Sequence, residues 1–310
     1  MSFKVEKVPS TRTIVGTRAH WDELTQSLYY NDVEGTIFRY DYKENKVYSA
    51  TVDGEKVVGF IIPVANATKT SAKDEYALGL GRRVGIVHWD GVSNRALLGP
   101  IAFEVEGDKQ NNRFNAAKAC PLGRFYGGTM RSEKCGDIFQ VAAGSLYKYI
   151  KGDGVYELTD GVFVSNGLAW DETTNKMYYI DTGKFDVKEY DWDRKTGDIS
   201  NERVVIDFSD NGKNAGFLPD GLTIDTEGNL YITNFGGSNV VKVEPKTGKI
   251  LMEIPIPAKQ VSSITFGGPN LDILYVTTAS SGDSDNELAG YLFKITGLGT
   301  KGFPGVRVRV

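Results

Sequence analysis

Oxygen-bearing side chains precede glycine in two loops of nearly identical sequence. One loop reads Ser165-Asn166-Gly167-Leu168 and the other reads Pro219-Asp220-Gly221-Leu222. An asparagine or aspartate beside a glycine suits a tight turn, so local backbone geometry can explain either loop by itself. Calcium and similar cations, however, bind carboxylate and amide oxygens that are collected from separate segments. If the two loops converge in space, Asn166 and Asp220 are candidate metal ligands.

Both loops belong to a repeat that runs along the whole chain. Short apolar strands with tyrosine recur six times, about every 44 to 53 residues, and in most repeats a second strand follows after a turn. A period of this length with only strands between is typical of a β-propeller. The tyrosine segments are Leu28-Tyr29-Tyr30, Tyr76-Ala77-Leu78, Phe125-Tyr126-Gly127, Met177-Tyr178-Tyr179, Leu230-Tyr231-Ile232 and Leu274-Tyr275-Val276.

We therefore expect an all-β protein, a six-bladed β-propeller that forms one domain over residues 1–310. A repeat fold of this kind is one cooperative unit, so its period outweighs the length of the chain, which alone would suit two average domains. We expect the N- and C-terminal strands to close one blade, with Phe3–Glu6 pairing beside Gly305–Val310.

In a propeller the loop that enters each innermost strand faces the central channel. Five repeats have such a loop about 10 to 12 residues before the tyrosine strand, and the residue at that position should point toward the axis. Several oxygen-bearing side chains directed at one axis favour a binding or metal site over five independent turns. The residues at this position are Thr17, Asn115, Asn166, Asp220 and Ser263.

The composition is that of a globular protein and excludes several classes of partner. Hydrophobic residues make up 40% of the 310 residues and charged residues 25%, with a net charge of −4. Lys and Arg are scattered, whereas nucleic-acid binding needs a concentrated basic face, so we expect no nucleic-acid partner. No apolar run is long enough to span a membrane, and the first residues do not resemble a signal peptide, so we expect no membrane association and a cytoplasmic location.

Few other residues suggest chemistry. The two cysteines, Cys120 and Cys135, are too few for a disulfide framework and fit a reducing compartment. We interpret the only histidines, His20 and His88, as packing or turn residues. The sequon Asn66-Ala67-Thr68 has no secretory signal to accompany it, so we interpret it as accidental.

Taken together, these segments resemble a known family. The chain is similar over nearly its whole length to the regucalcin, senescence marker protein, gluconolactonase and luciferin-regenerating enzyme family, and most of all to the insect regucalcin-like members. That resemblance implies a six-bladed propeller with a divalent metal on its axis. The segments that carry it are His20-Trp21-Asp22, Asn112-Arg113-Phe114-Asn115, Gly128-Thr129-Met130, Ser165-Asn166-Gly167-Leu168, Pro219-Asp220-Gly221 and Phe266-Gly267-Gly268-Pro269-Asn270-Leu271.

The resemblance also implies roles for individual residues. The family holds its metal with a glutamate, an asparagine and an aspartate; Asn166 and Asp220 match the last two, but Thr17 stands where the glutamate is expected. Arg113 and Asn115 match residues that recognise substrate hydroxyl and carbonyl groups, and Glu133 matches a further substrate contact. In the family's reaction, metal-assisted lactone hydrolysis, the aspartate accepts a proton, so Asp220 is the candidate catalytic residue.

The departure at Thr17 predicts a changed site. A hydroxyl in place of a carboxylate removes one negative charge from the metal ligands, and an inward-pointing Arg18 would repel a cation. We therefore expect no metal, or a weakly bound calcium or zinc ion, and reduced or lost lactonase activity. The remaining pocket would bind or transform a small polar molecule such as a lactone, with Asp220 as a metal-free base.

Two alternatives remain open from the sequence. Thr17 could still supply an oxygen while another carboxylate supplies the charge, which would leave a functional calcium- or zinc-dependent sugar lactonase. The chain could also be a protein-interaction platform, a role that propellers often serve. Whether it is an enzyme is therefore undecided at this stage.

Overall fold

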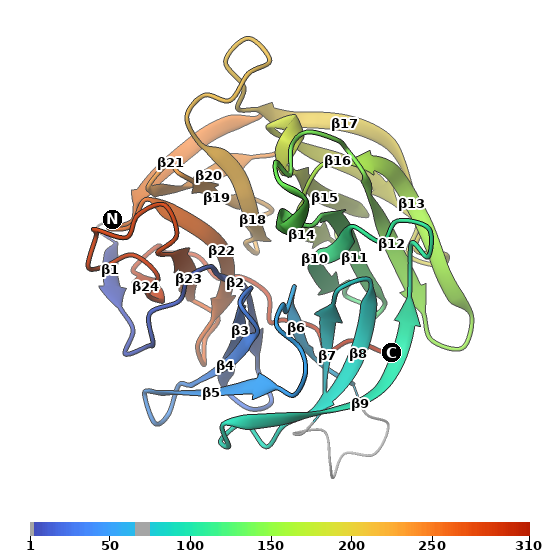
Figure 1. Cartoon of the computed structure of the whole chain (residues 1–310). Coiled ribbons are helices and arrows are strands. Elements are labelled where there is room, and N and C mark those ends of the chain that lie inside the picture. Colours follow the sequence, from blue (N-terminus) through green and yellow to red (C-terminus); the bar gives the residue numbers. More distant parts are fainter. Residues whose placement is uncertain (1–2, 66–74) are drawn as a thin grey trace.

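The structure is a computed structural model that describes residues 3–65 and 75–310. Within this part every regular element is a β-strand, except for two single-turn 3-10 helices, η1 (Glu133–Cys135) and η2 (Thr182–Lys184). The strands stand in a ring around a central axis (Figure 1). The prediction of an all-β propeller is therefore confirmed. The sequon at 66–68 lies outside the described residues.

Antiparallel groups of four strands, here called meanders, repeat around the ring. Two meanders are separate sheets, and the other four are joined in pairs into two eight-stranded sheets by the contacts β5–β9 and β19–β22. In each meander the first strand lies nearest the axis and the last strand lies at the rim (Figure 1). The meanders consist of β2 (Gly16–Asp22), β3 (Ser27–Asp32), β4 (Thr36–Asp41) and β5 (Lys46–Val52); β6 (Ile61–Pro63), β7 (Glu75–Leu80), β8 (Arg83–His88) and β9 (Arg95–Glu104); β10 (Asn112–Ala119), β11 (Phe125–Arg131), β12 (Gly144–Ile150) and β13 (Gly154–Val162); β14 (Ser165–Asp171), β15 (Lys176–Asp181), β16 (Asp186–Trp192) and β17 (Ile199–Asp207); β18 (Leu218–Ile224), β19 (Leu230–Phe235), β20 (Asn239–Glu244) and β21 (Lys249–Pro255); and β22 (Gln260–Gly267), β23 (Ile273–Ala279), β24 (Phe293–Thr296) and β1 (Lys4–Lys7).

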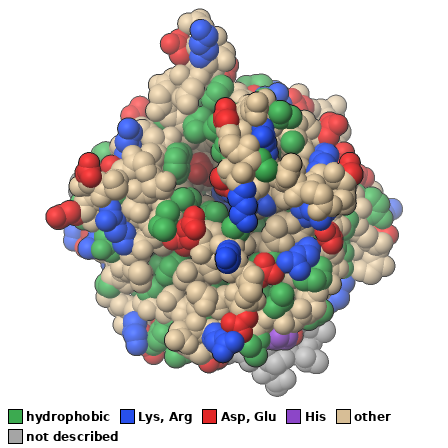
Figure 2. Space-filling view, in the orientation of Figure 1, with side chains coloured by type: hydrophobic (Ala, Val, Ile, Leu, Met, Phe, Trp, Pro, Cys, Tyr) green, Lys and Arg blue, Asp and Glu red, His purple; other side chains and the backbone are tan. Residues whose placement is uncertain are grey.

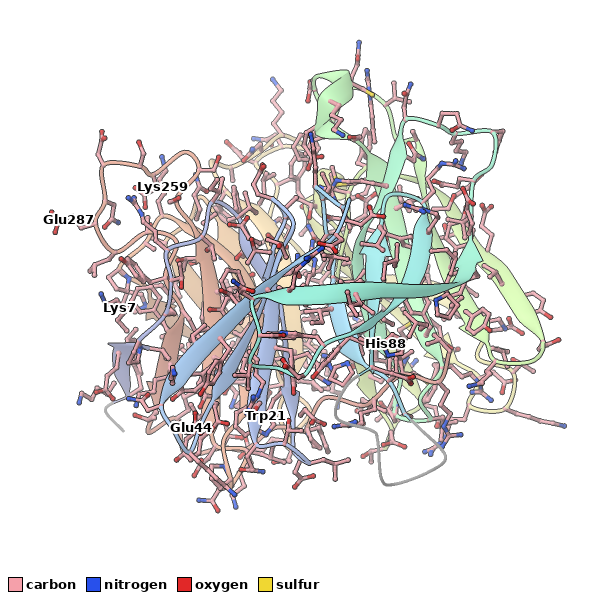
Figure 3. All side chains as sticks on the ribbon, turned by 60° about the horizontal axis from the view of Figure 1, so that its bottom comes forward. Lys7, Trp21, Glu44, His88, Lys259 and Glu287 are labelled. Carbon is pink, nitrogen blue, oxygen red and sulfur yellow. The ribbon has the colours of Figure 1, made fainter. Side chains whose placement is uncertain are left out.

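The tyrosine segments of the repeat form the second strand of each meander, namely β3, β7, β11, β15, β19 and β23. Their aromatic rings are buried between neighbouring meanders, because a strand in this position is covered on both faces. At the seam between the first and last meanders, the rings of Trp21 and Tyr275 stack with their centroids 5.6 Å apart. Figure 3 shows Trp21 toward the lower end of the strands, here called the lower face, whereas Lys259 lies toward the upper face seen in Figure 1.

The N-terminal strand joins the last meander. Strand β1 pairs antiparallel with β24, with Val5 opposite Ile295. An N-terminal and a C-terminal strand therefore share one meander, as predicted, but the predicted partner of Phe3–Glu6, Gly305–Val310, is wrong. The reason is that the C-terminal tail makes its hydrogen bonds elsewhere: Gly305 N donates to Trp21 O, Val308 N to Pro63 O and Arg309 N to Gly123 O. The tail (299–310) therefore crosses the lower face from one meander to the next instead of completing a sheet.

The innermost strands carry a register shift near the point where they face the axis. In β14 and β18 two residues, Asn166 with Gly167 and Asp220 with Gly221, stand opposite one residue of the neighbouring strand. Such a bulge turns side chains away from the regular alternation. The backbones also approach closely, because a Cβ on Gly167 would lie 2.4 Å from Leu222 Cβ. Similar shifts occur in β2, β10 and β22.

The surface has no single charged stripe on the face in view. Basic and acidic side chains are interspersed among uncharged ones (Figure 2). Among the described residues, no helix is long and apolar enough to cross a membrane. Both cysteines are free thiols, Cys120 buried and Cys135 partly buried.

The tail should contribute to stability through one buried ion pair. Arg307 donates from Nε and Nη2 to the two carboxylate oxygens of Asp22, at 2.9 and 2.7 Å, and the Asp22 side chain is 2% exposed. Arg307→Met would leave this carboxylate buried without its main counter-charge, so we expect a loss of about 3 kcal/mol or more in the free energy of unfolding. Urea unfolding measures the loss. Arg309→Met, at an exposed position of the same tail, should change stability little, and equal effects of both changes would contradict the role of the ion pair.

Candidate functional site

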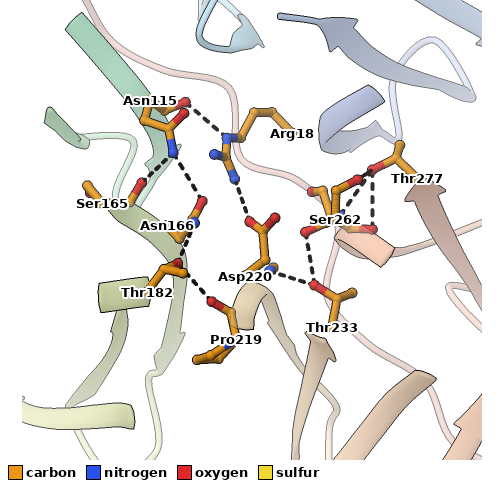
Figure 4. Close-up of polar contacts among 12 residues, drawn as sticks. Arg18, Asn115, Ser165, Asn166, Thr182, Pro219, Asp220, Thr233, Ser262 and Thr277 are labelled. Atoms are coloured by element: carbon orange, nitrogen blue, oxygen red, sulfur yellow. Dashed lines mark hydrogen bonds and ion pairs between the residues drawn. The ribbon is translucent and has the colours of Figure 1, made fainter. Parts of the chain in front are cut away.

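The loops predicted to face the axis do converge there. Asn115, Asn166, Asp220 and Ser263 come from the innermost strands β10, β14, β18 and β22, and all four are buried. Figure 4 shows Asn166 and Asp220 on neighbouring innermost strands, with the Arg18 side chain of β2 between Asn115 and Asp220. Arg18, which the sequence placed only beside the expected ligand, is thus the fifth member of the group.

Arg18 spans the gap between two of these strands. Its Nε donates a hydrogen bond of 3.0 Å to the Asn115 carbonyl oxygen, and its Nη1 lies 3.3 Å from Asp220 Oδ1 in an ion pair. The two side chains of this pair are 9% and 12% exposed. In the described part of the chain, Thr17 makes no side-chain hydrogen bond to Asn166 or Asp220. The cationic group at the axis is therefore supplied by the protein itself.

The backbone of β2 explains why Arg18 points inward. Thr17 stands the same number of residues before Asp22 as Asn166 before Asp171, so Arg18 is the counterpart of Gly167. The bulge in β2 falls one residue later and comprises Arg18 and Ala19, while Thr17 remains paired with Asn31. Arg18 has a φ of 58°, in the left-handed region that costs a non-glycine residue free energy. The Arg18 side chain thus occupies a position at which the loop of β14 has a glycine, Gly167.

Burial sets the electrostatics of the ion pair. It raises the pKa of Asp220 to about 6, although the Arg18 guanidinium acts in the opposite direction. Burial also lowers the pKa of Arg18, which Asp220 opposes. Since arginine titrates far above neutral pH, Arg18 stays protonated. Both groups are therefore charged at pH 7, and Asp220 becomes neutral below about pH 6.

A chain of hydrogen bonds fixes the amide side chains beside the ion pair. Arg113 Nη1 donates to Asn115 Oδ1 at 2.9 Å, and Asn115 Nδ2 contacts Asn166 Oδ1 at 3.3 Å. Asn166 Nδ2 donates to Thr182 Oγ1 at 2.6 Å, and that hydroxyl donates to the Pro219 carbonyl oxygen at 2.8 Å. The side-chain amides of Asn115 and Asn166 thus use both donor and acceptor groups in hydrogen bonds with their neighbours, and these bonds fix the orientation of each amide.

The outer end of this chain is an ion pair at the mouth of the channel. Arg113 donates from Nε and Nη2 to the two oxygens of Glu133, the first residue of η1. The Arg113 side chain is 6% exposed, whereas that of Glu133 is 52% exposed. Burial would raise the pKa of Glu133, but the hydrogen bonds and charge of Arg113 hold it below its usual value. The three predicted substrate contacts, Arg113, Asn115 and Glu133, thus lie together and connect with Asn166.

The groups at the axis do not fit a divalent cation as they are arranged. Calcium takes six to eight oxygen ligands, usually with several carboxylates. Asp220 is the one carboxylate here, its Oδ1 is engaged by Arg18, and the oxygens of Asn166 and Asn115 are engaged as well. No group of three or more His, Cys, Asp or Glu side chains suited to a metal occurs among residues 3–65 and 75–310. A guanidinium adjacent to the position would repel a cation.

Below Arg18 the channel narrows to a cavity of about 40 Å³, lined also by His20, Asn166, Ser263 and Lys118. Burial lowers the pKa of His20 to about 4, so the imidazole is neutral at pH 7. The side chain is 5% exposed. A cavity of this volume admits water-sized groups. A ligand larger than water would therefore bind above Arg18, at the mouth of the channel on the upper face.

The charge state of Asp220 is a direct test of the ion pair. Arg18→Met removes the positive charge that favours the ionised form of Asp220. The pKa of Asp220, about 6 in the native protein, should therefore rise in this variant. Carboxyl carbon-13 NMR over pH 4 to 9 measures both midpoints. Arg194→Met removes an arginine that pairs with Glu172 at the surface and should leave the midpoint unchanged. A midpoint that does not move in Arg18→Met would show that the two groups do not interact.

Comparison with known proteins identifies the family of the chain. Residues 15–280 match the family model described as SMP-30/Gluconolactonase/LRE-like region. The regucalcins of Gallus gallus and Danio rerio are 35% and 36% identical over 309 residues, which cover 98% of this chain and 97% of each relative. A luciferin-regenerating enzyme structure superposes with a TM-score of 0.89 at 38% identity over 100% of both chains. A calcium-binding regucalcin from Agrobacterium tumefaciens, 19% identical, shares the fold with a TM-score of 0.83 over 99% of this chain and 98% of its own. The chain belongs to the SMP-30, gluconolactonase and luciferin-regenerating enzyme family.

Proposed function

We propose that this regucalcin-like protein has an altered axial site, in which the Arg18–Asp220 ion pair takes the place of a bound divalent metal. In this proposal the upper mouth of the channel binds or transforms a small polar molecule such as a lactone, and metal-dependent lactone hydrolysis is reduced or lost. The observation that carries the proposal is the Arg18 guanidinium, 3.3 Å from Asp220 at the point where the innermost strands converge.

The ion pair retains groups that a ligand can use. In the described part of the chain, Arg18 Nη2 and Asp220 Oδ2 have no hydrogen-bond partner, and both side chains keep some exposure. An unused N–H donor beside an unused carboxylate oxygen is complementary to a hydroxyl or carbonyl group of a small molecule. Arg113, Asn115 and Glu133 are proposed to contact the same molecule, because they lie at the same mouth and Glu133 is accessible to solvent.

Charge is the argument against ordinary metal-dependent catalysis. Thr17 contributes no negative charge, and Arg18 contributes a positive one. Two like unit charges about 4 Å apart repel by about 4 kcal/mol at an effective dielectric constant near 20. Asp220 is then proposed to act as a metal-free general base in any residual reaction. Its pKa of about 6 is close enough to neutral pH for proton transfer from water.

The proposal extends to the blade count and the location of the protein. We infer that each four-stranded meander is one blade, which gives six blades in one domain over residues 1–310. Five meanders follow one another in chain order, and the sixth joins β22, β23 and β24 to the N-terminal strand β1. A cytoplasmic location is supported by the two free cysteines, which suit a reducing compartment. No partner beyond the small molecule is proposed.

Metal content and lactone hydrolysis distinguish the proposal from its alternative, a functional calcium- or zinc-dependent sugar lactonase. We expect the purified protein to contain less than one equivalent of divalent metal by mass spectrometry. We also expect slow or no hydrolysis of gluconolactone. Calcium and zinc should not stimulate this hydrolysis, and EDTA should not inhibit it. Stoichiometric, tightly held metal together with rapid, EDTA-sensitive turnover would establish the alternative and reject the proposal.

Two substitutions should rebuild a cation site in steps. Arg18→Gly removes the competing charge and suits the left-handed backbone at this position, and Thr17→Glu adds the missing carboxylate. Calorimetric titration should show that the double variant binds calcium about tenfold or more tightly than the native protein, whereas Thr17→Glu alone gains little.

A backbone control accompanies these variants. Asn201→Gly places glycine at an exposed position that also has a positive φ of 53°, so it reproduces the conformational effect without touching the axis. It should leave calcium affinity unchanged. If Thr17→Glu alone restored tight binding, Arg18 would not be the group that excludes the cation.

A further inference from the structure

A second pocket lies at the opposite end of the channel, where the C-terminal tail crosses the lower face. The tail residues Phe303, Pro304, Gly305 and Val306 form one side of it, and residues from the lower ends of the innermost strands form the other. Its volume is about 260 Å³, several times that of the cavity below Arg18. This volume suits a small organic molecule rather than a water molecule alone.

The walls of the lower pocket are mostly apolar. Besides the tail residues, the lining includes the apolar Trp170, Ile224, Pro121 and Ala119, with Thr223 and Thr265 as hydroxyl-bearing members. Trp170 is 6% exposed, and its indole Nε1 is buried with no hydrogen-bond partner in the described part of the chain. Phe303 is 52% exposed, an unusual setting for a large aromatic side chain that lines a cavity. Apolar walls with few polar groups are typical of small-molecule sites.

The polar group of greatest consequence in this pocket is Lys118. Its Nζ donates one hydrogen bond of 3.1 Å, to the Leu168 carbonyl oxygen, and no carboxylate of the described residues lies within ion-pair distance. The carboxylate of Glu172, which also lines the pocket, is paired with Arg194 at 2.8 Å. Burial lowers the pKa of Lys118 to about 8, so most molecules carry the ammonium at pH 7. An ammonium has three N–H donors, and only one of them is used here.

An ammonium that is withdrawn from water without a counter-ion is costly. Among the described residues, the buried Lys148 shows how this cost is normally met. Lys148 has a side chain 5% exposed and pairs with Asp198 at 2.6 Å. Lys118 lacks such a partner but opens into a cavity with apolar walls. The missing group is therefore an acceptor with negative charge, attached to an apolar body that fills the pocket.

We propose that the lower pocket binds an apolar monocarboxylate, whose carboxylate contacts Lys118 and whose apolar part packs between Trp170 and Phe303. This site differs from the upper mouth, which lies on the other side of Arg18. The narrow cavity below Arg18 lies between them and shares Lys118, Thr265 and Gly305 with the lower pocket. Its ligand differs in chemistry from the polar molecule proposed for the upper site. The C-terminal tail acts as part of the binding wall.

Isothermal titration calorimetry with octanoate tests the proposal, with octanol and octylammonium as ligands of matched length. Octanoate should bind with one-to-one stoichiometry, octanol should bind more weakly and octylammonium should not bind. Lys118→Met keeps the length of the side chain but removes its charge, and it should weaken octanoate binding about tenfold or more. Lys148→Met, which removes a buried but paired lysine outside the pocket, should leave it unchanged.

The ligand comparison on the native protein keeps the test decisive if Lys118→Met fails to fold. Phe303→Ala supplies a further variant, because it shortens an exposed side chain of the tail. It should weaken the binding of octanoate and of octanol by similar factors, since both ligands have the same apolar chain. Octanoate that binds no tighter than octanol to the native protein would overturn the proposal. So would a folded Lys118→Met variant that binds octanoate as the native protein does.

Discussion

The convergence of the innermost strands on one axis is the constraint on which the rest of this structure depends. Ring closure brings polar backbone and side-chain groups from different meanders into a narrow channel, where each must find a partner. Bulges in these strands turn selected side chains toward the axis, and glycines such as Gly167 allow the strands to approach closely. The hydrogen-bonded chain from Arg113 to the Pro219 carbonyl is one consequence of this requirement.

Charge at the axis follows from the same constraint. A buried carboxylate such as Asp220 needs a cation, which can be a metal ion or a side chain. In this chain the bulge of β2 directs Arg18 to Asp220, and the left-handed backbone at Arg18 is the conformational cost of that arrangement. Family membership alone would suggest a metal site, whereas the contacts of this particular chain favour an internal cation. The difference rests on the residues of a single loop.

The lower end of the channel differs in that its charged group has no counter-charge among the described residues. There the cation, Lys118, is provided by a strand, and no acid of the described residues pairs with it. The tail closes over this end and is itself held by the pair between Arg307 and Asp22. The two mouths therefore differ in chemistry: one has a paired charge with unused hydrogen-bonding groups, and the other has an unpaired charge among apolar walls. A propeller can support separate sites at its two faces because each is built from different loops.

The sequence by itself determined the all-β class, the repeat, the tyrosine strands and the loops of Asn115, Asn166 and Asp220. These features depend on local pattern and period, which a single chain displays directly. It also indicated that Thr17 breaks the expected ligand set. Only the tertiary structure decided that Arg18 forms the ion pair with Asp220, because the position of a bulge depends on pairing between strands. The path of the C-terminal tail and the isolation of Lys118 were likewise beyond the sequence, since both arise from contacts between residues far apart in the chain.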